Sequence, residues 1–215
     1  MSLSTQRAVC GNRQDAGIFA VTRGKHAVRM MVQDRATVLV ALLALSACAG
    51  GNFRPVSDTP VRIGRPYQVR GTTFVPVADP AYDVLGYASW YGSESGNRTA
   101  SGERFRPAWI TAAHTTLPLP TYVEVTALGT GRRIVVRVND RGPFVKGPRI
   151  IDLSRGAAAQ LGIQARGTAA VRVRRIEPDE KDRNRLRHGK PAADLPPLDT
   201  ATLANLRAQL SAAGF

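Results

Sequence analysis

The strongest strand signals of the chain lie in Tyr122-Val-Glu-Val-Thr126 and Ile134-Val-Val-Arg-Val138. Both are rich in β-branched residues, which favour strands. The segment between them, Leu128-Gly-Thr-Gly-Arg132, carries two glycines and is typical of a hairpin turn. Residues 122–138 therefore predict two antiparallel strands joined by a short loop.

Shorter strand signals flank this hairpin, and they cover residues 86–91, 150–153 and 170–176. Ser154 can cap a brief helix that runs to Leu161 and ends at Gly162. About six short strands with one short helix predict a mainly β fold, a small barrel over residues 85–176. Irregular extensions are expected on both sides of the barrel.

Four local strings in this region combine polar, aromatic and turn residues. They are Ala88-Ser89-Trp90-Tyr91-Gly92, Thr99-Ala100-Ser101-Gly102-Glu103, Thr111-Ala112-Ala113-His114 and Val138-Asn139-Asp140-Arg141-Gly142-Pro143-Phe144. Each alone is explained by a turn, a solvated loop or core packing. Together, in this order, and followed by Ile151-Asp-Leu-Ser154, they resemble the rare lipoprotein A family. The resemblance covers roughly residues 65–176.

The resemblance implies a six-stranded double-psi β-barrel and an enzyme of the cell wall. Such an enzyme is a lytic transglycosylase, which cleaves the glycan strands of peptidoglycan and leaves anhydro-muramyl ends. A preference for strands that lack stem peptides, a role in wall remodelling or daughter-cell separation, and contacts with division or cell-wall proteins are further expectations. A non-catalytic glycan-binding or wall-loosening module, similar to an expansin, is the alternative.

The polar trio of the family falls on Glu103, His114 and Asp140. One carboxyl can act as acid and then as base where its surroundings raise its pKa. Asp140 is the expected acid/base, because it follows a strand and precedes a tight turn. Glu103 is the competing candidate, or a second carboxylate that raises the pKa of the first. His114 is expected to orient a carboxylate or the substrate.

Three neighbouring residues are candidates for substrate binding. Trp90 and Tyr91 could stack on sugar faces, although core packing explains Trp90 equally well. Arg141 would lower the pKa of Asp140 if the two paired. We therefore expect the Arg141 guanidinium to turn away or to hold a backbone carbonyl.

The chain is strongly basic, with 30 Lys+Arg against 16 Asp+Glu and a formal net charge of +14. This balance favours a polyanionic neighbourhood such as nucleic acid, anionic lipid or cell wall. Two isolated cysteines and three scattered histidines form no metal-ligand pattern, so neither a metal nor a cofactor is expected.

An export signal precedes the barrel and argues against nucleic acid as the partner. Residues 36–47 form an uncharged apolar run, too short to span a membrane, that ends at Cys48. Leu45-Ser-Ala-Cys48 resembles a bacterial lipobox, so Cys48 is the expected lipidation site. The protein is then a membrane-anchored lipoprotein of the cell envelope that faces the periplasm, with the outer membrane favoured by Ala49.

The expected segments follow from these signals. They are an atypical or misassigned extension (1–29), a signal peptide (30–47), a tether and arm (48–84), the barrel (85–176) and a flexible charged and proline-rich tail with a short helix (177–215).

Overall fold

The computed structural model describes residues 53–92, 96–145 and 147–214. Cys48 and the expected signal peptide, residues 30–47, lie outside the described residues. Among the residues that are described, no helix is long and apolar enough to cross a membrane.

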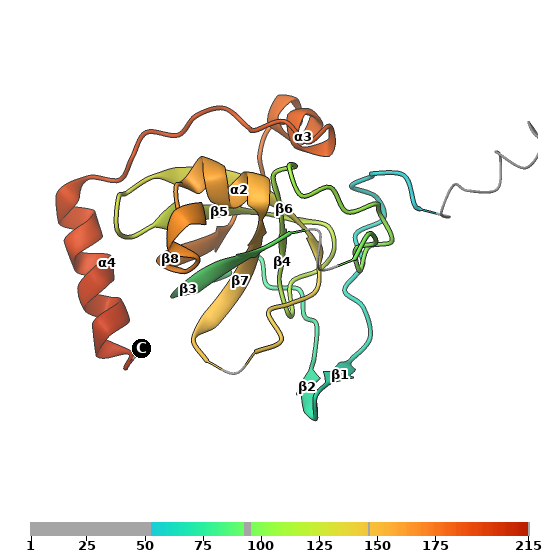
Figure 1. Ribbon diagram of the computed structural model, residues 1–215, viewed down its shortest axis with the longest axis horizontal. Helices are drawn as coiled ribbons and strands as arrows, with labels where there is room; N and C mark the ends of the chain where they lie inside the picture. The colour runs from blue at the N-terminus through green and yellow to red at the C-terminus, as the bar shows by residue number, and fades with distance from the viewer. Residues whose placement is uncertain (1–52, 93–95, 146, 215) are drawn as a thin grey trace, which may run out of the picture. The chain divides into compact units, whose positions relative to one another are not determined.

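Six strands close into a barrel in the order β3-β7-β4-β6-β5-β8 (Figure 1). Their bounds are Asp83–Tyr91 (β3), Thr111–Ala113 (β4), Thr121–Ala127 (β5), Arg133–Asp140 (β6), Arg149–Ser154 (β7) and Ala169–Arg175 (β8). The pairs β3–β7 and β4–β6 are parallel, and the other neighbouring pairs are antiparallel. The predicted mainly β, six-stranded double-psi barrel is confirmed.

The central hairpin forms as its sequence predicts. Val123 pairs with Val136 and Val125 with Ile134 in the antiparallel register of β5 and β6. These aliphatic side chains lie in the buried core, where each stabilises the fold by about 1.5–3 kcal/mol. Strand β4 has no comparable sequence signal, since Thr-Ala-Ala carries one β-branched residue, and its pairing with β6 and β7 makes it a strand.

The helix α2, Arg155–Leu161, follows β7 with the expected caps. The Ser154 side chain accepts a hydrogen bond from the Ala157 backbone, and Gly162 closes the helix at φ +83°. Gly156 is required for packing, because a Cβ atom there would lie 2.2 Å from the Ala108 carbonyl oxygen. The first turn of α2 therefore sits directly on the loop before β4.

The arm that precedes the barrel is attached to it by backbone hydrogen bonds. A two-stranded hairpin, β1 (Tyr67–Val69) and β2 (Thr72–Phe74), forms around Gly71. The Tyr67 and Phe74 rings stack on each other, and both contact the Phe144 ring after β6. From Phe53 onward, the segment expected as a tether thus lies on the barrel.

Residues beyond the barrel also differ from the flexible tail that was expected. They form α3 (Glu180–Arg187) and α4 (Thr200–Ala212), which Asp179 and Asp199 cap. The helix α4 lies beside the barrel (Figure 1). Three of its leucines are buried with Leu128 in a small apolar cluster: Leu203, Leu206 and Leu210. The leucines of α4 pack against an apolar surface of the barrel. The composition of the tail alone does not predict that surface.

Candidate active site

Asp140 ends β6 with its carboxyl held by neutral donors. Its Oδ1 accepts hydrogen bonds from the backbone N–H groups of Ala100 and Arg141, both at 2.8 Å. Within the described part of the chain, Oδ2 has no hydrogen bond and the carboxyl has no ion pair. Burial raises the pKa of Asp140 and outweighs the opposing effects of these hydrogen bonds and of the Arg141 charge. The carboxyl is therefore fixed at one oxygen and holds its proton more strongly than a solvent-exposed aspartate.

The Arg141 guanidinium holds backbone carbonyls, as expected. It donates to the carbonyl oxygens of Leu117 at 2.6 Å, Ile63 at 3.1 Å and His114 at 3.2 Å. These three bonds join the arm to the segment that follows β4. Because the guanidinium is engaged there, it stabilises the surroundings of Asp140 without forming an ion pair with its carboxylate.

Glu103 is a buried, fully paired carboxylate. It is 3% exposed, and both of its oxygens accept from the Arg137 guanidinium at 2.8 Å. The Asn139 amide donates a third hydrogen bond, also at 2.8 Å. Because the Arg137 guanidinium and the Asn139 amide occupy both carboxylate oxygens, neither oxygen is free to reach a leaving group. The geometry suits Glu103 to positioning the end of β6.

His114 is neutral and buried. Its Nδ1 accepts from the backbone N–H groups of Thr116 and Leu117, so the ring proton lies on Nε2 and is donated to the Tyr82 hydroxyl at 2.9 Å. Burial and the Arg141 charge lower the His114 pKa to about 3. The imidazole thus orders the turn whose carbonyls receive Arg141.

The three predicted polar residues meet around the end of β6 without direct side-chain bonds among them. Glu103 binds Asn139, the neighbour of Asp140, and the His114 backbone N–H donates to the Asp140 carbonyl oxygen at 3.0 Å. The trio is connected through β6 and the segments beside it. Within the described structure, Asp140 is the member of the trio that keeps a carboxyl oxygen without a hydrogen bond.

Trp90 and Tyr91 differ in their surroundings, because successive residues of a strand face opposite sides. The Trp90 indole N–H donates to the Gln164 carbonyl oxygen at 3.1 Å, and its ring packs against the core. Tyr91 stacks on Phe105 with ring centroids 4.8 Å apart. Burial raises the Tyr91 pKa, and the charges of Asp140 and Asp152 raise it further.

Asp152 is a residue of this region that the sequence reasoning missed. It pairs with Ala113 in the β4–β7 register, and it accepts hydrogen bonds from Ser89 at 2.6 Å and Arg149 at 3.3 Å. Burial raises its pKa despite these partners. An acidic residue between aliphatic neighbours in a barrel strand was the available signal.

A pocket of about 310 Å³ lies beside this site, between the arm and the barrel. Its lining includes Ala100, whose N–H binds Asp140, together with Glu103 and Arg141. The described residues contain no group of three His, Cys, Asp or Glu side chains arranged to hold a metal ion.

Comparisons with known proteins point to one family. A family model described as "Lytic transglycolase" matches residues 83–173. Over 115 residues the chain is 52% identical to the endolytic peptidoglycan transglycosylase RlpA of Pseudomonas aeruginosa (strain UCBPP-PA14), a match that covers 53% of this chain and 33% of that protein. The RlpA of Neisseria meningitidis (strain DSM 15465 / Z2491) is 47% identical over 118 residues, 54% of this chain and 49% of that protein. The chain thus spans about a third to a half of the length of these relatives.

Proposed function

We propose that the protein, whose residues 83–173 match the model of a family described as "Lytic transglycolase", is a peptidoglycan lytic transglycosylase. The substrate is the glycan strand, and the reaction leaves an anhydro-muramyl end. Asp140 is the single acid/base. The observation that carries this assignment is a desolvated carboxyl with a raised pKa, one oxygen fixed by two backbone N–H groups and no ion pair in the described structure.

In this mechanism Asp140 first gives its proton to the glycosidic oxygen as the bond from that oxygen to the muramoyl C1 breaks. Positive charge develops on the sugar ring. The 6-hydroxyl of the same sugar then bonds to C1 and returns its proton to the Asp140 carboxylate. The proton balance closes without water, so one carboxyl suffices.

The same geometry argues against Glu103 as the acid. Its two oxygens are occupied by Arg137 and Asn139, and its side chain is buried. Glu103 and His114 are assigned positioning roles: Glu103 through Asn139, and His114 through the turn that binds Arg141.

The test is product analysis with the full chain carrying Cys48→Ser. Purified sacculi and peptide-free glycan strands are incubated with the protein, and products are identified by mass spectrometry. Anhydro-ended fragments support the proposal, and faster release from peptide-free strands supports the narrower preference. Binding to sacculi without anhydro products would instead favour a non-catalytic glycan-binding module.

A lipid anchor at Cys48 is part of the proposal, with the barrel facing the periplasm. The support is the lipobox-like sequence Leu45-Ser-Ala-Cys48 after an apolar run. The intact mass of the membrane-extracted protein tests it. A mature chain that begins at Cys48 and carries diacylglycerol and acyl chains is expected, and an unmodified chain in the soluble fraction would contradict the anchor. Imaging of a fluorescent fusion tests the role in daughter-cell separation.

A further inference from the structure

The pocket beside Asp140 is built by the arm as much as by the barrel. The Arg54 backbone N–H donates to the Gly102 carbonyl oxygen at 2.8 Å. Arg62 and Leu119 exchange two backbone hydrogen bonds, each at 2.8 Å. The Arg54 side chain lies across Gly102, where a Cβ atom would be 2.9 Å from the arginine Cδ. These contacts fix both ends of the arm segment that lines the pocket.

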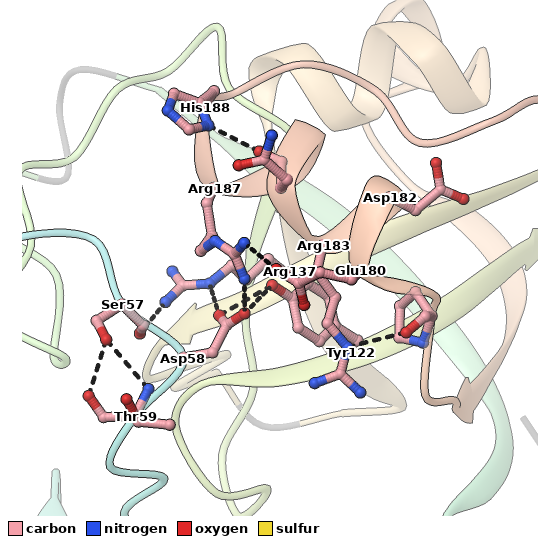
Figure 2. Close-up of polar contacts among 12 residues, drawn as sticks. Ser57, Asp58, Thr59, Tyr122, Arg137, Glu180, Asp182, Arg183, Arg187 and His188 are labelled. Atoms are coloured by element: carbon pink, nitrogen blue, oxygen red, sulfur yellow. Dashed lines mark hydrogen bonds and ion pairs between the residues drawn. The ribbon is translucent and has the colours of Figure 1, made fainter.

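Asp58 holds the middle of this arm segment, residues 54–62, against the barrel and α3 (Figure 2). Its carboxylate accepts from Arg187 of α3 at 2.6 Å, from Tyr122 of β5 at 2.9 Å and from Arg137 of β6 at 3.1 Å. Arg137 also donates to the Ser57 carbonyl oxygen at 2.7 Å. Burial raises the pKa of Asp58, but the hydrogen bonds from Arg187, Tyr122 and Arg137 outweigh it and lower the pKa overall. The pocket wall is therefore anchored to the strand that ends in Asp140.

The pocket carries uncompensated positive charge. Arg54 and Arg62 line it, and neither guanidinium has a hydrogen bond or ion pair within the described part of the chain. The acidic residue in the lining is Glu103, whose charge is already neutralised by Arg137. An anion in this pocket would meet two cationic groups with free donors.

Part of the remaining wall is apolar, beside the hydroxyl side chains of Ser57, Thr59 and Ser101. The apolar part is formed by Pro55, Pro60, Leu119 and Pro120. A ligand that suits the pocket therefore combines a small apolar group with a negative charge. The lactyl ether of a muramoyl residue has this composition, a methyl group next to a carboxylate. In a strand that retains its stem peptide, the same carboxyl is an amide and carries no charge.

We propose that this pocket is a subsite for the free lactyl carboxylate of a muramoyl residue, bound by Arg54 and Arg62. The inference rests on the proposed function, because it takes the glycan strand as the substrate. Ala100 and Arg141 line the pocket and donate their N–H groups to Asp140, so the bound sugar lies next to the acid. A preference for peptide-free strands then follows from charge recognition by the barrel and its arm.

The test measures binding in a protein that cannot turn over its ligand, the full chain with Cys48→Ser and Asp140→Asn. Calorimetric titration compares a peptide-free tetrasaccharide of alternating N-acetylglucosamine and N-acetylmuramic acid with tetra-N-acetylchitotetraose, which has no lactyl group. The muramoyl ligand is expected to bind at least about tenfold more tightly, and Arg54→Gln with Arg62→Gln should remove that advantage. Arg70→Gln is the matched control, an exposed arginine of the arm outside the pocket.

A second measurement changes the ligand and leaves both arginines in place. Methyl esterification of the lactyl carboxyls removes their charge and should weaken binding to the same Cys48→Ser, Asp140→Asn protein by the same factor. Equal binding of the esterified and free ligands, equal binding of chitotetraose, or no binding of either sugar would overturn the subsite. Binding is measured without turnover, so its result does not depend on whether the protein cleaves glycan in the sacculus assay. Discrimination without cleavage would keep the subsite and reject the lytic activity.

Discussion

Glu103 carries a buried carboxyl group and Asp140 a partly buried one, and their surroundings differ in kind. Glu103 faces a guanidinium and an amide that occupy both of its oxygens. Asp140 faces two backbone N–H groups at one oxygen and no cation in ion-pair contact within the described structure. The cost of desolvation is offset by the Arg137 charge at Glu103, whereas at Asp140 it exceeds the opposing effects of the hydrogen bonds and of Arg141. The difference separates a carboxylate that holds the fold from a carboxyl that can transfer a proton.

The largest expected effect is on catalysis at Asp140. Asp140→Asn keeps an oxygen to accept the Ala100 and Arg141 N–H groups but cannot donate and retrieve a proton. We expect the rate of anhydro-muramyl product formation to fall by about 10²–10⁴-fold. The midpoint of thermal unfolding should change little. Full activity in this variant would reassign the acid to another carboxyl, with Asp152 and Glu103 as the nearest choices.

Glu103→Gln is expected to act on stability first. It leaves the Arg137 guanidinium buried without its main counter-charge, and loss of one partner of such a pair costs about 3–5 kcal/mol. Urea unfolding measures this cost. The matched control is Glu177→Gln, whose side chain is 60% exposed in its ion pairs and should cost less than about 1 kcal/mol. A stable Glu103→Gln protein with no activity would show that the two carboxyls have been assigned the wrong way round.

The sequence predicts only part of the difference between the surroundings of Glu103 and Asp140. Strand periodicity, the Gly-rich turn before β6 and the cap at Ser154 are local signals, so the barrel hairpin and α2 could be predicted from them. The partner of Glu103 could not, because Arg137 sits inside a β-branched run and reaches Glu103 only when the barrel closes.

The surroundings of Asp152 and the packing of α4 also depend on contacts between residues far apart in the sequence, so they could not be predicted from local patterns. Asp152 looks like one polar residue in a short strand until β7 pairs with β4 beside Asp140. The helix α4 shows its leucines locally, but the surface at Leu128 that buries them comes from another part of the chain. Residue roles at Asp140 and His114 remain predictions that the variants must decide.

Burial of His114, like burial of the two carboxyl groups, makes the stability of the protein depend on pH. Its pKa falls from about 6.5 in the unfolded chain to about 3 in the folded protein, so the unfolded state binds more protons between these values. The contribution of His114 to the free energy of unfolding is present above about pH 6.5, and it is lost as the pH falls from there towards 3. From pH 6 to pH 5 the loss should be about 1 kcal/mol.

Replacement of the imidazole isolates this contribution. His114→Gln should be less stable at pH 7 but should lose less stability between pH 6 and pH 5 in urea unfolding. The raised pKa values of Asp140 and Asp152 act in the opposite direction, since protonation of these carboxyls favours the folded state as the pH falls. An unchanged slope in His114→Gln would mean that His114 is not the buried neutral base of this site.

The smallest expected effect concerns the Tyr82 hydroxyl, which accepts the His114 Nε2 proton. Tyr82→Phe removes that acceptor and should cost about 1 kcal/mol of stability, with transglycosylase activity retained. Tyr87→Phe is the control, because the Tyr87 ring packs in the apolar cluster of α4. If Tyr82→Phe instead lost activity as severely as Asp140→Asn while remaining folded, the Tyr82 hydroxyl would have to act on the substrate. His114 would then serve by orienting that hydroxyl, and the proton transfer could no longer be assigned to Asp140 alone.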